Sequence, residues 1–534
     1  MPETGGSRYR NLKRLVVYRA LPLVAAMACI AATGFAQSAD RCREMTEFRL
    51  PGMQLEITRA AWIPAGPSRG MGPGEGVTLP AHCRVDGMID RRTGAGGDSY
   101  GIGFAVSLPE NWNGRFLQQG GGGLNGTVAE PLGGGAAGSR PALLRGFAVA
   151  TTDTGHQAKG GGGFDAGFMR DQQAVIDFQY AAIGRVAVVA KQIVETYYAK
   201  PPARSHYVGC STGGREAMLM TQRYPLYFDG VIAGAPAMRT GHSNLANRTL
   251  SVAMNRIAPK GADGKSVAGG GLSDGDRESI IAGRLDACDG RDGVRDGMIF
   301  DTQGCDFDPA ALTCSGPKAE GCLSPAQVAA LKEGFAGPKD SRGNQVYPGF
   351  FFDTGITASG GGIPGLIASG PSPLGSLNSA SEQDIDREAA LANANPGSRL
   401  GDSASWTDLN TFSARGGKLI FYHGVSDPWF SARDTIDYYR RMTAAGGGEA
   451  QVMRWSRLFL VPGMGHCSGG SAALDSFDLL GAIVDWVEQG NAPDSVTATG
   501  RAFPGRSRPL CAFPTHARYK GRGDPEAATS FECQ

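Results

Sequence analysis

The stretch that decides the fold is Gly209-Cys210-Ser211-Thr212-Gly213, which fits the pattern G-x-S-x-G. A short apolar run at 205–208 precedes it and predicts a strand, and residues 214–224 have the spacing of a helix. A strand, a sharp turn and a helix are the context in which such a motif exposes a serine hydroxyl. Glycines on both sides suit the turn, because side chains there would clash. The motif therefore predicts that Ser211 is a nucleophile.

Strands and helices alternate on both sides of this motif. Apolar runs predict strands at 115–119, 146–152, 228–233, 418–422 and 456–461, and helical spacing predicts helices at 171–198, 433–444 and 476–490. Residues 40–110 are predicted to form short strands and turns. This alternation predicts an α/β fold with a doubly wound, mostly parallel sheet.

The alternation stops between residues 236 and 415. This part of the chain is richer in Gly, Ser, Asp and Cys and has only scattered helical stretches, such as 324–335. We therefore expect residues 236–415 to form a large inserted lid domain. Residues 40–235 and 416–534 would then form the catalytic domain. An insertion over an α/β core is a common place for the wall of a ligand pocket.

A nucleophilic serine needs a general base and a carboxylate that orients the base. In α/β-hydrolases these residues follow in the order Ser, acid, His. Asp427 and His466 each come shortly after a predicted strand, as this fold requires. His423 is the main rival for the base, but it stands at a strand end and is expected to bond locally. His156 is expected to be structural. The sequence thus predicts an α/β-hydrolase core with a triad of Ser211, Asp427 and His466.

Two further features of the predicted site follow from its neighbours. Cys210 precedes Ser211 and Cys467 follows His466, so a disulfide is expected if the two catalytic loops meet. The oxyanion hole is expected to use the N–H of Thr212 and a second amide from the glycine run 120–123, either Gly121 or Gly122.

The segment 289–298 carries Asp289, Asp292 and Asp296 separated by glycines. Closely spaced oxygen ligands with tight turns suit Ca²⁺. The spacing is not that of an EF-hand, and a solvated acidic turn is the alternative. Because the segment lies in the insertion, away from the triad, a structural role for the ion is expected.

The N-terminus predicts export. Residues 1–19 carry five basic residues and one acid, 20–32 are apolar, and small residues lead to Ala36, so residues 1–36 read as a secretory signal peptide. Without Cys29, ten of the 11 cysteines remain, an even number that suits an oxidising compartment. A secreted or periplasmic location is therefore expected. The apolar run is too short to span a bilayer, so no stable membrane anchor is expected. The formal net charge of +1 predicts no nucleic-acid partner.

Several motifs together resemble the tannase/feruloyl esterase family, which includes mono(2-hydroxyethyl) terephthalate hydrolases. The similarity lies in W-N-G-R-F-L-Q (112–118), T-D-T-G-H (152–156), G-C-S-T-G-G-R (209–215), R-Y-P-L-Y-F-D-G-V-I-A-G-A-P-A (223–237), Y-H-G-V-S-D-P (422–428) and P-G-M-G-H-C (462–467). The resemblance implies the same triad and the Cys210–Cys467 disulfide. It also implies calcium bound by Asp289, Asp292 and Asp296 and by the carbonyls of Val294 and Met298. The further disulfides that it implies are Cys42–Cys83, Cys288–Cys305, Cys314–Cys322 and Cys511–Cys533.

The predicted function is that of an exported serine carboxylesterase. It would hydrolyse small-molecule esters of aromatic acids, of the feruloyl, galloyl or terephthalate-monoester type, through an acyl-enzyme on Ser211. No specificity residue is assigned in the segment 347–395. Two alternatives use the same residues or fold: an acyltransferase or peptidase with this triad, and a calcium-dependent polyphenol- or carbohydrate-binding protein. The presence of all three triad residues argues against a pure binder, because binding does not require them.

Overall fold

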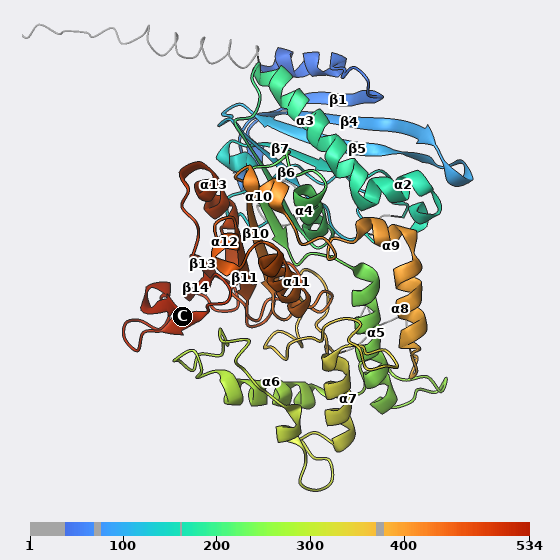
Figure 1. Ribbon diagram of the computed structural model, residues 1–534, viewed down its shortest axis with the longest axis vertical. Coiled ribbons are helices and arrows are strands. Elements are labelled where there is room, and N and C mark those ends of the chain that lie inside the picture. Colours follow the sequence, from blue (N-terminus) through green and yellow to red (C-terminus); the bar gives the residue numbers. More distant parts are fainter. Residues whose placement is uncertain (1–37, 69–75, 161–162, 370–378) are drawn as a thin grey trace, which may run out of the picture.

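A computed structural model describes residues 38–68, 76–160, 163–369 and 379–534. The predicted signal peptide, residues 1–36, lies outside these residues. The largest sheet in the described chain has nine strands in the order β1-β4-β5-β7-β6-β8-β9-β10-β11 (Figure 1). Its parallel part runs from β7 to β11 and consists of β7 (Ala148–Thr152), β6 (Arg115–Gln119), β8 (Arg204–Cys210), β9 (Gly230–Gly234), β10 (Lys418–Gly424) and β11 (Ser456–Val461).

Helices cover both faces of the parallel strands. Neighbouring residues of one strand face opposite sides, so Phe116 packs in one hydrophobic cluster and Leu117 in another. The first cluster includes residues of α3 (Ala182–Tyr198), α4 (Thr212–Gln222) and α11 (Ala432–Ala445). The second includes α13 (Leu479–Gln489) and a small sheet of β12 (Ser476–Phe477), β13 (Ser495–Thr499) and β14 (Ser507–Cys511). The predicted doubly wound, mostly parallel sheet is confirmed.

The N-terminal edge of the sheet differs from the prediction. Residues 40–110 were expected to form short strands and turns. Two strands there are short, β2 (Gly66–Pro67) and β3 (Thr78–Leu79), but three are long and antiparallel, namely β1 (Leu55–Ile63), β4 (His82–Thr93) and β5 (Ser99–Pro109). Glycines that suggest turns lie inside these strands instead. Gly87 faces Phe104 of the neighbouring strand, and a Cβ at residue 87 would overlap the ring. The glycine therefore makes room for a cross-strand aromatic side chain and ends no strand.

Two predicted helices have different limits. The helix expected at 171–198 is interrupted, since α2 (Gln172–Ile176) leads into a π-helical stretch, Asp177–Ala181, before α3 begins. A wide turn of this kind inserts one residue into the helical ladder. The helix expected from residue 476 begins at Leu479, because Ser476 and Phe477 pair with β13.

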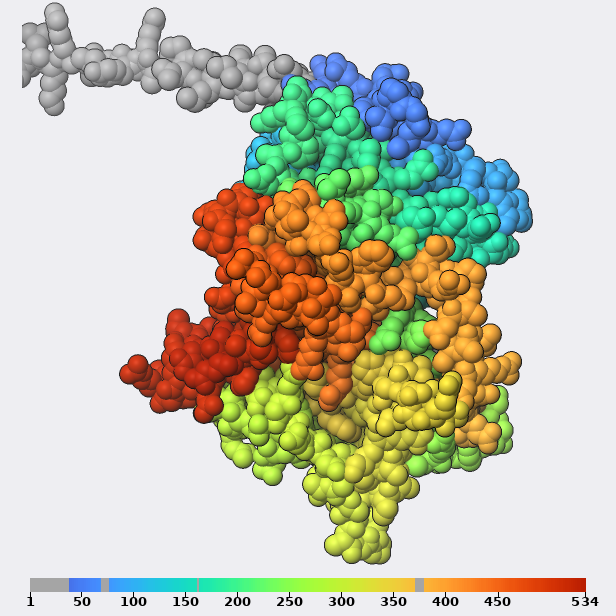
Figure 2. Space-filling view, viewed as in Figure 1, coloured from blue at the N-terminus to red at the C-terminus, as the bar shows by residue number. Residues whose placement is uncertain are grey.

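The segment between β9 and β10, residues 235–417, is called the insertion below. It contains α5 (Thr240–Ile257), α6 (Asp274–Cys288), α7 (Pro325–Ala336), α8 (Ile385–Ala394), α9 (Pro396–Gly401) and α10 (Asn410–Ala414). A separate hydrophobic cluster fills it, with Leu250, Leu331 and Phe335 among its members. Its helices α5 to α8 gather at the end of the molecule away from β1 (Figures 1 and 2).

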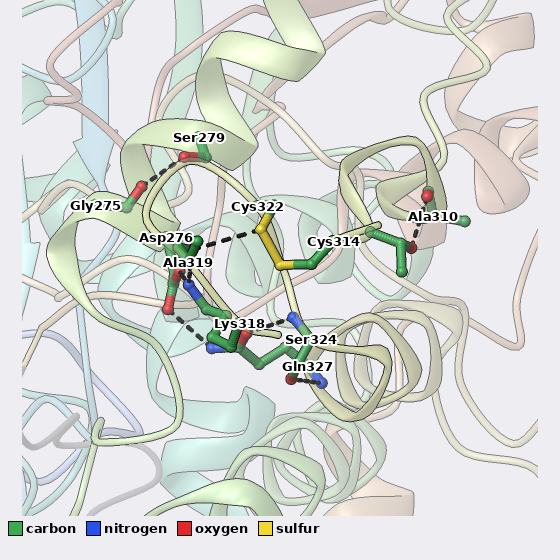
Figure 3. The surroundings of a disulfide bond; sticks show 11 residues. Gly275, Asp276, Ser279, Ala310, Cys314, Lys318, Ala319, Cys322, Ser324 and Gln327 are labelled. Carbon is green, nitrogen blue, oxygen red and sulfur yellow. Dashed lines mark hydrogen bonds and ion pairs between the residues drawn. A yellow bond between two sulfur atoms is a disulfide. The ribbon is translucent and has the colours of Figure 1, made fainter. Parts of the chain in front are cut away.

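Local contacts explain where α6 and α7 begin. Ser273 and Ser324 each form a capping box with the third residue of the helix that follows. The Cys314–Cys322 disulfide closes the short loop beside these two helix ends, and Lys318 of the loop pairs with Asp276 of α6 (Figure 3). In the described part of the chain, no helix combines the length and the apolar character needed to cross a membrane.

Candidate active site

The three residues of the predicted triad follow three strands of the parallel part of the sheet. Ser211 comes directly after β8, Asp427 after β10 and His466 after β11. Parallel strands end at the same edge of a sheet, and β8 to β11 are consecutive neighbours. The three loops therefore meet at that edge, the usual place for the site of an open α/β sheet.

Ser211 stands in a strained turn. Its backbone has φ 64° and ψ −123°, a conformation that non-glycine residues rarely adopt. The chain can turn so sharply because Gly209 packs directly on Gly213, where a Cβ on either residue would overlap backbone atoms. The Ser211 N–H donates to the carbonyl of Gly234 at the end of β9, 3.0 Å away. The turn thus holds the serine side chain at the amino-terminal end of α4.

His466 and Asp427 form a buried pair. His466 Nδ1 lies 2.7 Å from Asp427 Oδ2, and the side chains are almost fully enclosed. Asp427 Oδ1 accepts from the N–H groups of Trp429 and Phe430 at 2.8 and 3.1 Å. Burial by itself would raise the pKa of Asp427, but the adjacent His466 and His423 hold it well below its usual range. The carboxylate is therefore ionised, as orientation of an imidazole requires.

The rival histidines have other contacts. His423 Nδ1 lies 2.8 Å from Thr435 Oγ1 and its Nε2 lies 2.9 Å from the carbonyl oxygen of Phe430, so both ring nitrogens have local partners. The His423 ring also comes within 3.4 Å of Asp427. His156 stacks on Phe168 with ring centroids 3.7 Å apart. Neither ring lines the cavities at Ser211 described below, whereas His466 does.

A disulfide joins the serine loop to the histidine loop. Cys210 and Cys467 are bonded with their Cα atoms 6.0 Å apart, although 257 residues separate them in the chain. Both cysteines line the same cavity as Ser211 and His466. The four other disulfides that the resemblance implied are also formed.

The glycine run after β6 offers one of the two amides expected for an oxyanion hole. The Gly121 N–H donates to Glu216 Oε2 at 3.0 Å, and a Cβ on Gly121 would overlap the Asn125 side chain. The expectation for Gly121 is therefore wrong, because its amide already has a buried partner. Gly122 faces open space and lines the cavity with Ser211. Thr212 is the first residue of α4, where N–H groups have no partner within the helix.

Two cavities meet at Ser211. One of about 580 Å³ is mostly apolar and is lined by core residues such as Phe178 and Phe430 and by 395–398 and 400–401 of the insertion. The other, of about 670 Å³, is lined by 119–123, His466 and 361–363 of the insertion. Both are bordered by Phe164 and Trp429, whose ring centroids lie 5.3 Å apart. Phe164 is 59% exposed, which is unusual for a phenylalanine and places it at the mouth of the site.

The sequence analysis missed these two aromatic residues. The sequence offers a signal for Trp429, because this residue stands two positions after the predicted acid, Asp427. In the structure the backbone N–H of Trp429 donates to the Asp427 carboxylate. Nothing in the glycine-rich surroundings of Phe164 marks it. A bond from the Leu124 N–H to the Gly163 carbonyl, 3.0 Å long, places Phe164 beside the glycine run after β6, and the sequence does not reveal this contact.

The predicted calcium loop places its acidic side chains close together. Burial, with Asp296 and Asp289 nearby, raises the pKa of Asp292 to about 7. Asp289 accepts from the N–H groups of Asp296 and Gly297, and Arg508 pairs with Asp296. Over the residues that the structure describes, no group of three or more His, Cys, Asp or Glu side chains is arranged to hold a metal ion. The donor set is nevertheless all oxygen and crowded with negative charge, which is the chemistry that Ca²⁺ prefers.

Comparison with known proteins places this site in a family. A family model described as "Tannase and feruloyl esterase" matches residues 83–393 and 377–534. The chain belongs to the tannase and feruloyl esterase family. It is 36% identical to a mono(2-hydroxyethyl) terephthalate hydrolase of Piscinibacter sakaiensis, over 90% of this chain and 89% of the relative. It is 30% identical to feruloyl esterase B of Aspergillus niger, over 80% of this chain and 82% of the relative.

Solved structures agree with this assignment. The crystal structure of feruloyl esterase B from Aspergillus oryzae has a TM-score of 0.74 and 25% identity, covering 93% of this chain and all of the other. Tannin acyl hydrolase from Aspergillus niger shares the fold with a TM-score of 0.70 and 22% identity, over 93% of this chain and 94% of the other. As a member of this family, with named esterase and hydrolase relatives over most of its length, the chain is a carboxylic ester hydrolase with an α/β-hydrolase fold.

Proposed function

We propose that the protein is an exported serine esterase that hydrolyses esters of aromatic acids through an acyl-enzyme on Ser211. The observation that carries this proposal is the buried Asp427–His466 pair, which a disulfide ties to the loop of a strained serine. The relatives support the substrate class, since their names refer to terephthalate and ferulate esters.

In the proposed reaction, Ser211 Oγ attacks the ester carbonyl carbon and His466 accepts the proton of the hydroxyl. Asp427 keeps the imidazole oriented and stabilises its charged form. The amides of Thr212 and Gly122 stabilise the negative oxygen of the tetrahedral intermediate. His466 then protonates the alcohol as the C–O bond breaks, and a water molecule activated by the same histidine releases the acid.

The two cavities suit the two halves of an ester. His466 must reach the leaving oxygen, so the alcohol belongs in the cavity that His466 lines. The acyl group then occupies the more apolar cavity, where Phe178, Met238 and Phe430 offer surfaces for an aromatic ring. The insertion would act as a lid that supplies one wall of each cavity.

The test compares the wild type with Ser211→Ala on methyl gallate, methyl ferulate, chlorogenate and a terephthalate monoester. Turnover should fall by at least about 10³-fold in the variant, because the nucleophile is lost. A fluorophosphonate probe should label the wild type at Ser211 and leave the variant unlabelled. Turnover of Ser211→Ala at the wild-type rate would refute the mechanism. Parallel amide and acyl-transfer assays separate esterase activity from the peptidase and acyltransferase alternatives, and wild-type protein that binds these esters without turning them over would be a binding protein.

We further propose a structural Ca²⁺ bound by the side chains of Asp289, Asp292 and Asp296 and the carbonyls of Val294 and Met298. Bound calcium would neutralise carboxylates that are crowded in the folded chain. Chelation with EGTA should lower the melting temperature of the wild type and leave that of Asp292→Asn unchanged. An equal melting temperature of the wild type with and without chelator would count against the site.

Export is proposed from the leader-like residues 1–36 and from five disulfides that suit an oxidising compartment. Intact mass spectrometry of the protein released by its host should show a chain that begins near residue 37. A full-length mass would contradict the proposal.

A further inference from the structure

Glu216 is a carboxylate that the mechanism above does not use, although it bonds the glycine loop that lines the cavity at Ser211. It belongs to α4, the helix that begins directly after Ser211, and it is fully buried. A buried carboxylate is costly unless hydrogen bonds replace its lost water. Its surroundings should therefore show which part of the fold depends on it.

Three donors surround the Glu216 carboxylate. The Gly121 N–H donates to Oε2 at 3.0 Å, Asn125 Nδ2 donates to Oε1 at 3.1 Å, and the Tyr207 hydroxyl donates to Oε2 at 2.9 Å. Gly121 and Asn125 belong to the loop after β6, and Tyr207 belongs to β8. Since an ionised carboxylate can only accept, three donors suit its charged form. Glu216 thus ties the glycine loop to the nucleophile helix.

The peptide group after Gly121 is held on its other side as well. The Gly121 carbonyl accepts from the Gly213 N–H at 3.0 Å, and Gly213 lies in the first turn of α4. In a trans peptide the carbonyl and the following N–H point in opposite directions. Because the Gly121 carbonyl points at the Gly213 N–H, the Gly122 N–H points to the opposite side of this peptide group, and Gly122 lines the same cavity as Ser211.

We propose that Glu216 is a positioning residue for the oxyanion hole, because it holds Gly121 in the orientation that aims the Gly122 N–H at the oxygen of the tetrahedral intermediate. This inference rests on the proposed esterase function. It explains why the close packing at this point depends on glycines, since a Cβ on Gly120 or Gly213 would push the loop away from α4.

The test is Glu216→Gln, which keeps the shape of the side chain but replaces one accepting oxygen by an NH₂ group. That NH₂ group faces the donors that surround the carboxylate in the wild type. Loss of one oxyanion donor typically costs 10²–10³-fold in kcat, so we expect a fall of about 10²-fold with KM within about twofold of the wild type. Binding of an aryl trifluoromethyl ketone, which forms a tetrahedral adduct with the serine, should weaken by a similar factor. Binding of the free aromatic acid product should stay unchanged, because the acid needs no oxyanion hole.

Two further variants separate positioning from stability. Tyr207→Phe removes one donor to Glu216 and should lower kcat by roughly 10-fold, which keeps the test decisive if Glu216→Gln fails to fold. Asp276→Asn, at a buried carboxylate of the insertion, should lower the melting temperature without changing kcat or ketone binding.

Wild-type kcat and ketone affinity in Glu216→Gln, or in Tyr207→Phe if only that variant folds, would overturn the inference. That outcome differs from failure of the proposed function, in which the wild-type protein itself would turn over no ester and would not be labelled at Ser211.

Discussion

The parallel core and the insertion hold their functional residues in different ways. Ser211, Asp427 and His466 each follow a strand that is buried on both faces, and a disulfide joins the first loop to the third. The residues that the insertion contributes to the cavities lie in loops, in the first turns of α5 and in α9, a helix of six residues. The core therefore holds the reacting groups, whereas the insertion supplies part of the walls of both cavities. Four predictions test this division.

The largest effect is expected in the core, at Asp427. Asp427→Asn should lower kcat by about 10⁴-fold, because the amide no longer favours the imidazole tautomer that accepts the serine proton. Steady-state kinetics on the best aromatic ester measure the effect. Asp437→Asn, at an exposed carboxylate of α11, is the matched control and should behave as the wild type. A loss below about 10-fold in Asp427→Asn would assign the orienting role elsewhere.

Two disulfides, one from each region, give the next comparison. Replacing Cys210 and Cys467 by serine should lower kcat by about 10²-fold, because a shift of about 1 Å between nucleophile and base has an effect of that size. Replacing Cys314 and Cys322 in the insertion should leave kcat unchanged, since that bond joins cysteines only 8 positions apart in a loop beside α6 and α7 (Figure 3). Equal losses of kcat in the two double variants would contradict the division between the regions.

Asp353 belongs to the insertion but contacts the catalytic loops of the core, so it tests whether the insertion also affects the catalytic geometry. It is fully buried, and its Oδ2 accepts from Ser426 Oγ at 2.7 Å and from the Gly463 N–H at 2.8 Å. It therefore joins the loop of Asp427 to the loop of His466. Asp353→Asn should lower kcat by roughly 10-fold, because a displacement of either loop misplaces the base. Asp340→Asn, a carboxylate of the insertion that bonds within its own turn, should have wild-type kinetics. A wild-type kcat in Asp353→Asn would show that the catalytic geometry does not depend on this contact from the insertion.

The smallest expected effect is on the pH dependence of the free energy of unfolding. Burial in the core lowers the pKa of His206 to about 4, with Asp229 and Glu488 opposing the shift and Arg115 and Arg204 adding to it. The unfolded chain binds a proton at this residue near pH 6.5, so the free energy of unfolding decreases as the pH falls from about 6.5 to 4. The loss from His206 between pH 8 and pH 4.5 should be roughly 2–3 kcal/mol.

His206→Phe should therefore show a smaller fall in stability between these two pH values, measured by urea unfolding. His242 of the insertion is half-buried, and burial and Arg239 lower its pKa as well. Because water partly reaches this ring, His242→Phe should change the pH dependence less. A pH dependence in His206→Phe equal to that of the wild type would show that His206 does not titrate during unfolding.

Much of the core could be predicted because its signals are local. The strand at 115–119 and the strand at 456–461 have the predicted limits, since runs of apolar residues buried on both faces are short and distinctive. The length of the N-terminal strands was not predicted, because a glycine such as Gly87 suggests a turn. Gly87 instead makes room for the side chain of Phe104 on the neighbouring strand. The sequence also could not show that the amide of Gly122, and not that of Gly121, is available for the oxyanion hole. That difference depends on Glu216, which is distant in sequence and accepts from the Gly121 N–H.

The sequence by itself determined the elbow around Ser211, the order of serine, acid and histidine, and the cysteines that flank them. These features depend on residues that are neighbours in the chain or on the alternation of strands and helices. The tertiary structure decided which glycine amide remains available and that Glu216 and Asp353 support the catalytic loops. Each of these depends on side chains that are far apart in sequence and meet only when the sheet is assembled, so no local pattern records them.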